Sequence, residues 1–173
     1  MNPSGSMIQA RRRAMRLCAL LACLASPSLA HAAETCFVSA TPVAFGVYDT
    51  VASSPTTGTG QITVDCQGNK EVPVVIALSA GNGSYAARRM KSPLDALQYN
   101  LYLDTGYTRI FGDGSAGTEV GMCSTGVTGG GCSGTNPTGT YKRVVLPFFG
   151  RIPALQNVAS GNYSDSIQVT ISF

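Results

Sequence analysis

Histidine is almost missing from this chain, and its absence limits the chemistry that the chain can perform. The 173 residues include one histidine, His31, and no tryptophan. His31 lies in an N-terminal segment that we expect to be removed, so the mature domain has no histidine to assist a serine nucleophile. Its carboxylates are scattered along the sequence, which disfavours a glycosidase pair. We therefore expect no enzyme activity, no catalytic residues and no cofactor.

Long hydrophobic runs are also missing. The apolar run at residues 17–24 is far shorter than the roughly 20 residues that a membrane-spanning helix needs. Four arginines precede this run, and the small residues of Ala30-His31-Ala32 follow it. This order of charge, apolar run and small residues is typical of an export signal. It predicts a signal peptide over residues 1–32, one domain over residues 33–173, and no membrane span in the mature protein.

The mature domain has no excess of positive charge. The chain has 12 Lys and Arg against 9 Asp and Glu. Four of the arginines lie in the predicted signal, which leaves the domain with a net charge of about −1 and no basis for nucleic-acid binding. One basic cluster remains, Arg88-Arg89-Met90-Lys91, and we interpret it as a solvated loop.

Four cysteines remain in the mature domain once Cys18 and Cys23 leave with the signal. They are Cys36, Cys66, Cys123 and Cys132. An even number of cysteines in a small exported domain indicates disulfides, for which three pairings exist. Proximity along the chain favours Cys36 with Cys66 and Cys123 with Cys132. A zinc site is disfavoured because the domain has neither a Cys-x2-Cys pair nor a histidine, and we expect no metal.

Alternation of apolar and polar residues dominates the domain and predicts β-strands. The clearest case is residues 163–173, where every second side chain from Tyr163 to Phe173 falls on one face. We expect further strands at residues 43–48, 61–66, 72–80, 98–104 and 141–149. Of these, residues 72–80 are dense enough in β-branched side chains for burial on both faces, and Pro147 interrupts the last. Six or seven short strands suggest a sandwich with Greek-key connections.

The stretch 112–139 is rich in glycine, serine and threonine. We expect either a long exposed loop or a hairpin that a Cys123–Cys132 bond would hold. Residues 112–117 match G-x-G-x-x-G, but a dinucleotide site needs a helix next and the following residues show no helical pattern. We interpret the match as coincidence.

The order of several short motifs resembles the spore coat protein U domain family, pilin-like subunits of archaic chaperone–usher pili. The motifs run almost the whole length of the mature chain. They are an early cysteine, Phe45-Gly46-Val47-Tyr48, Gly60 to Cys66, Leu97 to Tyr102, Phe111-Gly112-Asp113-Gly114, Gly150 to Gln156, and Gly161 to Phe173. The G-x-Y-x-D pattern of the last motif is the most specific.

This resemblance implies an all-β, incomplete immunoglobulin-like (pilin-type) sandwich that lacks its final strand. The partners would be a periplasmic chaperone, an outer-membrane usher and other pilin subunits, so the chain would be exported through the periplasm to a surface pilus or a spore-coat-like layer. In the family pattern, Cys36–Cys66 joins the first two strands. The strand-acceptor groove would be bordered by Tyr163, Ile167, Val169, Ile171 and Phe173.

One departure from the family pattern concerns the N-terminus. Polymerising members carry a donor segment before the first cysteine, whereas cleavage after Ala32 would leave Ala33, Glu34 and Thr35 ahead of Cys36. We therefore expect this subunit to accept a strand without donating one, at the tip of a fibre. Two alternatives stay open. One is a surface adhesin or ligand-binding module that uses residues 112–139, and the other is a self-contained secreted β-domain.

Overall fold

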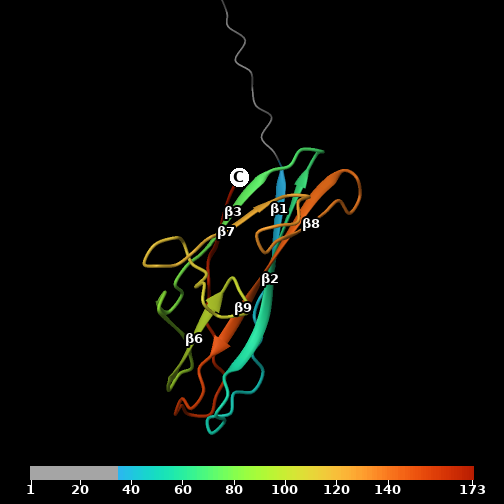
Figure 1. The fold of residues 1–173 in the computed structure, drawn as a ribbon. Helices are drawn as coiled ribbons and strands as arrows, with labels where there is room; N and C mark the ends of the chain where they lie inside the picture. Colours follow the sequence, from blue (N-terminus) through green and yellow to red (C-terminus); the bar gives the residue numbers. More distant parts are fainter. Residues whose placement is uncertain (1–34) are drawn as a thin grey trace, which may run out of the picture. The chain divides into compact units, whose positions relative to one another are not determined.

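The computed structural model describes residues 35–173, and the predicted signal peptide lies outside them. Within this range the chain forms ten strands and no helix, in two sheets (Figure 1). Accordingly, no helix in the described part is long and apolar enough to cross a membrane.

The larger sheet has the order β1-β2-β9-β6-β5-β4, with β8 added to β9. Its strands are β1 (Cys36–Thr41), β2 (Thr56–Gln67), β4 (Gly83–Ser84), β5 (Ala87–Lys91), β6 (Ala96–Tyr102), β8 (Ser133–Thr135) and β9 (Tyr141–Ile152). The smaller sheet has the order β10-β3-β7, with strands β3 (Pro73–Leu78), β7 (Gly121–Ser124) and β10 (Val169–Ser172).

The antiparallel pair of β2 and β9 is the backbone of the larger sheet, and Figure 1 shows the two long strands side by side. They pair over their full length, from Thr56 with Ile152 to Gln67 with Tyr141. Alternate side chains of both strands enter the core, including Ile62 and Leu146. Pro147 does not interrupt β9, because it lies between the part that pairs with β8 and the part that pairs with β6. No partner strand on that edge needs the N–H that proline lacks.

The smaller sheet packs one face on this core. Val74, Ile76 and Leu78 of β3 are buried, whereas Val75 between them is 40% exposed. The expected burial of residues 72–80 on both faces is therefore wrong. Density of β-branched residues does not distinguish a strand buried on both faces from a strand with one wet face.

Residues 43–48 do not form the expected strand. They follow β1 as an irregular segment that packs against glycines of β2 and β9. An added Cβ at Gly58 would lie 2.7 Å from Val43 Cγ1, and one at Gly150 would lie 2.5 Å from Phe45 Cζ. The apolar alternation of residues 43–45 thus reflects two side chains that pack against glycines, not a paired strand.

The basic cluster at residues 88–91 is also not the solvated loop that we expected. It belongs to β5, and Arg88 is fully buried. The Arg88 guanidinium donates to Asn100 Oδ1 at 2.7 Å, to Ser79 O at 2.9 Å and to Phe111 O at 2.8 Å. These acceptors replace the water lost by the two terminal nitrogens, whereas the buried Arg88 Nε has no partner among the described residues. Burial lowers the pKa of Arg88.

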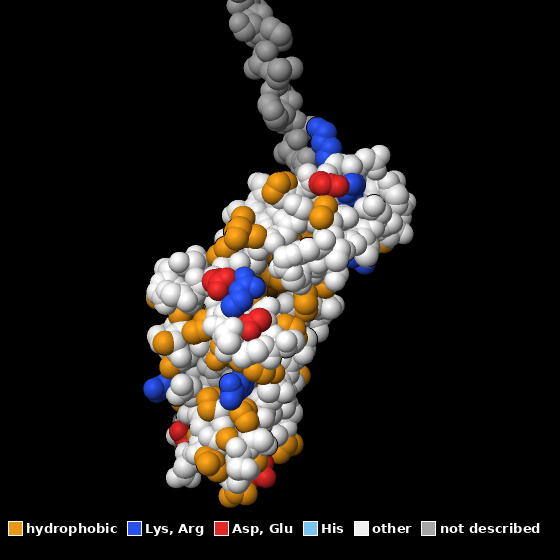
Figure 2. All heavy atoms as spheres, in the orientation of Figure 1, with side chains coloured by type: hydrophobic (Ala, Val, Ile, Leu, Met, Phe, Trp, Pro, Cys, Tyr) orange, Lys and Arg blue, Asp and Glu red, His pale blue; other side chains and the backbone are white. Residues whose placement is uncertain are grey.

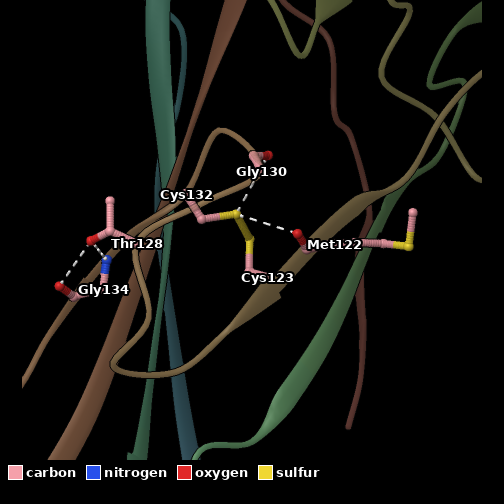
Figure 3. The surroundings of a disulfide bond; sticks show 6 residues. All are labelled: Met122, Cys123, Thr128, Gly130, Cys132 and Gly134. Carbon is pink, nitrogen blue, oxygen red and sulfur yellow. Dashed lines mark hydrogen bonds between the residues drawn. A yellow bond between two sulfur atoms is a disulfide. The ribbon is translucent and has the colours of Figure 1, made fainter.

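Two disulfides within residues 35–173 join strands and loops. The bond between Cys36 and Cys66 links the paired ends of β1 and β2. The bond between Cys123 and Cys132 links β7 to the turn before β8 (Figure 3). Residues 112–139 therefore hold two short strands from different sheets rather than one long loop. After residues 112–117 come turns and β7, not a helix.

Candidate functional site

The C-terminal segment, residues 163–173, pairs with the rest of the domain along one edge. Lys91 and Ser164 exchange two backbone hydrogen bonds, at 2.8 and 3.1 Å, and Ser79 N donates to Gln168 O at 2.9 Å. In an antiparallel ladder such bonds recur at every second residue. The backbone groups of Asp165, Ile167, Val169 and Ile171 therefore point toward the opposite edge. No strand within residues 35–173 pairs there.

Strand β1 is uncovered in the same way. It pairs with β2, and its other edge has no partner strand in the described part of the chain. Val38 lies directly opposite Val64 in the pairing of β1 with β2, so both side chains point toward the core, and Val64 is fully buried. Val38 itself is 47% exposed. A side chain that faces the core is therefore in contact with solvent, as expected where a neighbouring strand is missing.

A groove lies between these two uncovered edges. Its central cavity has a volume of about 400 Å³. It is lined on one side by residues 40–43 and Phe45, on the other by residues 163–165, Ile167 and Val169, and on its floor by Ile62, Leu78, Met90, Tyr99, Leu101 and Phe148. A second hollow of about 900 Å³ continues the groove between residues 43–50 and 158–163. Val43, Phe45, Met90 and Tyr163 line both.

Hydrogen bonds hold the walls of the second hollow in place. The Tyr48 hydroxyl donates to Pro153 O and accepts from Gln156 N, both at 2.8 Å. The Tyr163 hydroxyl donates to Ala159 O at 2.7 Å. The Asp95 carboxylate accepts from Ala159 N at 3.0 Å and from Ala96 N, and these two N–H groups lower the pKa of Asp95. These bonds join the walls of the second hollow to neighbouring segments of the fold.

Asp165 is the one charged side chain that lines the central cavity. Its Oδ1 accepts from Asn82 N at 3.1 Å and from Asn82 Nδ2 at 2.8 Å, and its Oδ2 accepts from the Tyr99 hydroxyl at 2.8 Å. Burial, and then the bond to Asp165, raises the pKa of Tyr99 well above its ordinary value. Asp165 therefore connects the C-terminal segment to β6 and to the turn at Gly81 and Asn82.

The structure places the five predicted groove residues at different depths. Tyr163, Ile167 and Val169 line the central cavity. Ile171 packs against the core beside it, and Phe173 is 61% exposed. The opposite wall, formed by Val43 and Phe45, was not predicted as part of the site, although the alternation of these residues was a signal for it.

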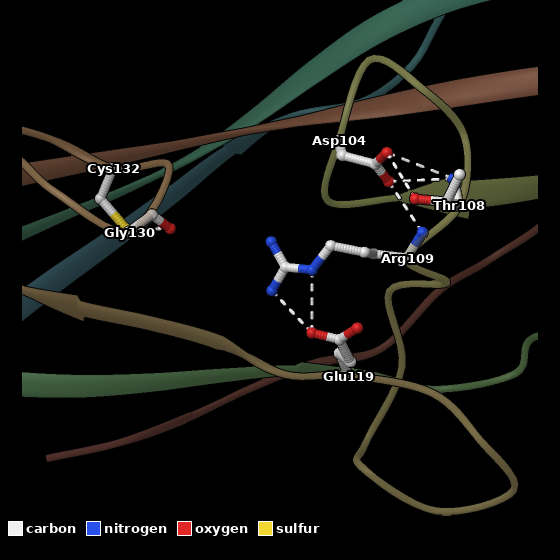
Figure 4. A network of polar contacts seen from close by, with 6 residues as sticks. All are labelled: Asp104, Thr108, Arg109, Glu119, Gly130 and Cys132. Carbon is white, nitrogen blue, oxygen red and sulfur yellow. Dashed lines mark hydrogen bonds and ion pairs between the residues drawn. The ribbon is translucent and has the colours of Figure 1, made fainter.

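A polar network on the surface lies outside the groove (Figure 4). Asp104 caps its own loop by accepting from Thr108 N and Arg109 N, and Arg109 pairs with Glu119 at 2.6 Å. Such exposed pairs contribute about 0–1 kcal/mol. The described residues contain no group of three or more His, Cys, Asp or Glu that could hold a metal ion.

Comparisons with known proteins agree with this geometry. The family model of the Spore Coat Protein U domain matches residues 21–170. The chain belongs to this family. The chain is also similar to a curated protein, Protein U of Myxococcus xanthus, at 32% identity over 144 residues, which cover 75% of this chain and 70% of that protein.

A solved structure has a similar fold. It is the pre-assembly complex of the chaperone CsuC with the tip adhesion subunit CsuE, from the archaic chaperone–usher Csu pili of Acinetobacter baumannii. The matching chain superposes with a TM-score of 0.51 at 21% identity, over 81% of the present chain and 40% of its own length. The predicted fold, a pilin-type sandwich that is not closed, is confirmed. The predicted family is confirmed as well.

Proposed function

We propose that this family member is an exported structural subunit of a chaperone–usher surface fibre, and that it accepts a β-strand from a partner into its groove. The observation that carries the proposal is the row of unpaired backbone groups at Asp165, Ile167, Val169 and Ile171 beside an apolar cavity. The family and the fold support the general role of a pilus subunit.

The physical basis is β-strand addition. An unpaired edge offers donors and acceptors to an extended chain, and pockets beside it select alternate side chains. An incoming strand would pair with residues 165–171, cover Val38 and place apolar side chains over Ile62 and Leu101. Its backbone bonds would supply affinity, and burial of the cavity walls would add about 25 cal/mol per Å² of apolar surface.

The proposed partners follow from this chemistry. A periplasmic chaperone would fill the groove first, another subunit would replace it at an outer-membrane usher, and the product would be a surface pilus or a spore-coat-like layer. A structural rather than catalytic role agrees with the family. A position at the fibre tip stays a prediction, since it depends on cleavage after Ala32, outside the described residues. N-terminal sequencing of the mature protein tests it.

Adhesion is a second candidate function, supported by exposed apolar side chains at one end of the domain. Val47, Val51, Leu94 and Leu155 are 94%, 80%, 84% and 64% exposed. Their loops are joined by the hydrogen bonds of Tyr48 and Asp95, and Figure 2 shows hydrophobic side chains at the lower end of the view. Adhesion of fibres to apolar surfaces should fall in a V47S/L155S variant that still assembles. Unchanged adhesion would remove this candidate.

The main proposal is tested by expression of the full chain in the periplasm in three forms: alone, with its chaperone, and fused after Phe173 to a turn and an alternating strand. We call the third form the strand-complemented chain. The chain alone should aggregate or be degraded, and the other two forms should be soluble. The control carries a fused strand of equal composition with its apolar residues moved to the outer face, and we call this strand the inverted strand. A soluble, stable monomer without any added strand would contradict the proposal.

A further inference from the structure

The inward face of the C-terminal segment carries one polar position in an apolar series. Tyr163, Asp165, Ile167 and Val169 alternate with exposed residues and all line the central cavity. Side chains directly opposite each other on antiparallel strands lie on the same face, about 4.5–5.5 Å apart at Cβ. Each inward residue of a strand in the groove would therefore contact one of these four side chains.

The Asp165 carboxylate retains capacity for a further hydrogen bond. Its Oδ1 is occupied by Asn82 and by Ser166 N at 2.8 Å. Its Oδ2 accepts the Tyr99 hydroxyl at 2.8 Å and only a long contact of 3.3 Å from Asn82 N. An ionised carboxylate has about four lone-pair sites, two on each oxygen. Oδ2 can therefore accept another donor, and Asp165 lines the central cavity.

In the part of the chain that the structure describes, no cation pairs directly with this carboxylate. The ion pairs within residues 35–173 involve Arg109, Lys142 and Arg143, and none includes Asp165. The buried Arg88 interacts with Asp165 through space, but its bonds go to Asn100 Oδ1 and to two backbone carbonyls. While the groove is open, water can solvate Oδ2. A strand that fills the groove removes this water, and a buried charge without a new donor is costly.

We infer that the strand which fills the groove carries a hydrogen-bond donor, a serine, threonine or lysine side chain, opposite Asp165, and apolar side chains opposite Ile167 and Val169. The inference rests on the proposed function. It identifies Asp165 as the residue that sets both the register and the chemistry of the accepted strand. An acidic residue at the opposite position is excluded by repulsion. An apolar residue is disfavoured because it leaves one acceptor site of Oδ2 without a donor once the water is gone.

The test uses the strand-complemented full chain, with a two-residue Asn-Gly turn after Phe173 to fix the register. Four versions differ only in the residue opposite Asp165, which is Thr, Lys, Val or Glu, and urea unfolding is measured. The equilibrium constant for unfolding should be about tenfold to a hundredfold lower with Thr or Lys than with Val, as expected for a hydrogen bond to a charged group. Glu should be the least stable.

Two controls separate this inference from general stability. Replacement of Val by Thr in the added strand at the position opposite Ile167 should destabilise the chain. This is the reverse of the stability order expected at the position opposite Asp165. In an Asp165→Asn background, the advantage of Lys over Val should largely disappear. If all four versions are equally stable, the inference is wrong while strand acceptance stands. If none is more stable than the chain with the inverted strand, the proposed function itself fails.

Discussion

Gly150 offers a test of how the first wall of the groove is built. In β9 this glycine lies below the irregular segment that follows β1. An added Cβ would lie 2.5 Å from Phe45 Cζ and 2.8 Å from Val43 Cγ1, whereas ordinary contacts begin at 3.4 Å. The Phe45 ring would therefore have to retreat by roughly 1 Å while Val43 blocks the other side. We expect Gly150→Ala to lower the free energy of unfolding by about 1–3 kcal/mol, the usual cost of overpacking.

The matched control for this variant is Gly129→Ala. Gly129 has no atom within 4 Å of an added Cβ. Its replacement should change the free energy of unfolding by no more than about 0.5 kcal/mol. Both variants are measured in the strand-complemented chain by urea unfolding followed by tyrosine fluorescence, since the chain has no tryptophan. Equal midpoints for the two variants would refute the packing of Phe45 and Val43 against Gly150.

Three further predictions use the same unfolding assay. Arg88→Ala should lower the free energy of unfolding by at least about 2 kcal/mol, because buried acceptors lose their donors. Arg89→Ala, on the exposed face of β5, should leave it nearly unchanged, and similar losses in the two variants would contradict the burial of Arg88. On the loop-entropy model, replacing Cys36 and Cys66 by serine should lower the free energy of unfolding by about 3.6 kcal/mol, and replacing Cys123 and Cys132 should lower it by about 2.6 kcal/mol. The reverse order would refute the loop-entropy explanation. The pKa of Asp95 is lowered in the folded state, so its contribution to stability is present above the unfolded pKa, near 4, and is lost as the pH falls through the folded pKa. Asp95→Asn should therefore flatten the fall in stability at acid pH. An unchanged fall would contradict the contact between Asp95 and Ala159.

The alternation in the sequence was enough to predict large parts of the two longest strands and the inward face of the C-terminal segment. The place of that segment beside a strand-acceptor groove followed only from the family resemblance. Residues 163–172 alternate between half-buried and exposed as expected, although only Val169–Ser172 are paired as a strand. The backbone of the rest of this segment makes only separate bonds to the sheets, those of Ser164 with Lys91 and of Gln168 with Ser79.

Two errors have a common physical cause. Residues 43–48 and Arg88 were misassigned because local pattern does not reveal which distant residues lie opposite. Gly150, which contacts Phe45, lies more than 100 positions away along the chain, and the acceptors of Arg88 come from three separate segments. Such contacts depend on the register of the sheets. For the same reason Tyr99 could not be recognised as the partner of Asp165.

Amide hydrogen exchange on the strand-complemented chain tests the central claim most directly. The N–H groups of Ile167, Val169 and Ile171 face the open edge, whereas that of Ser164 is bonded to Lys91. If the added strand pairs along this edge, the three amides should exchange as slowly as the Ser164 amide, and they should exchange fast in the control with the inverted strand. Fast exchange of all three in the strand-complemented chain would contradict acceptance of a strand at this edge.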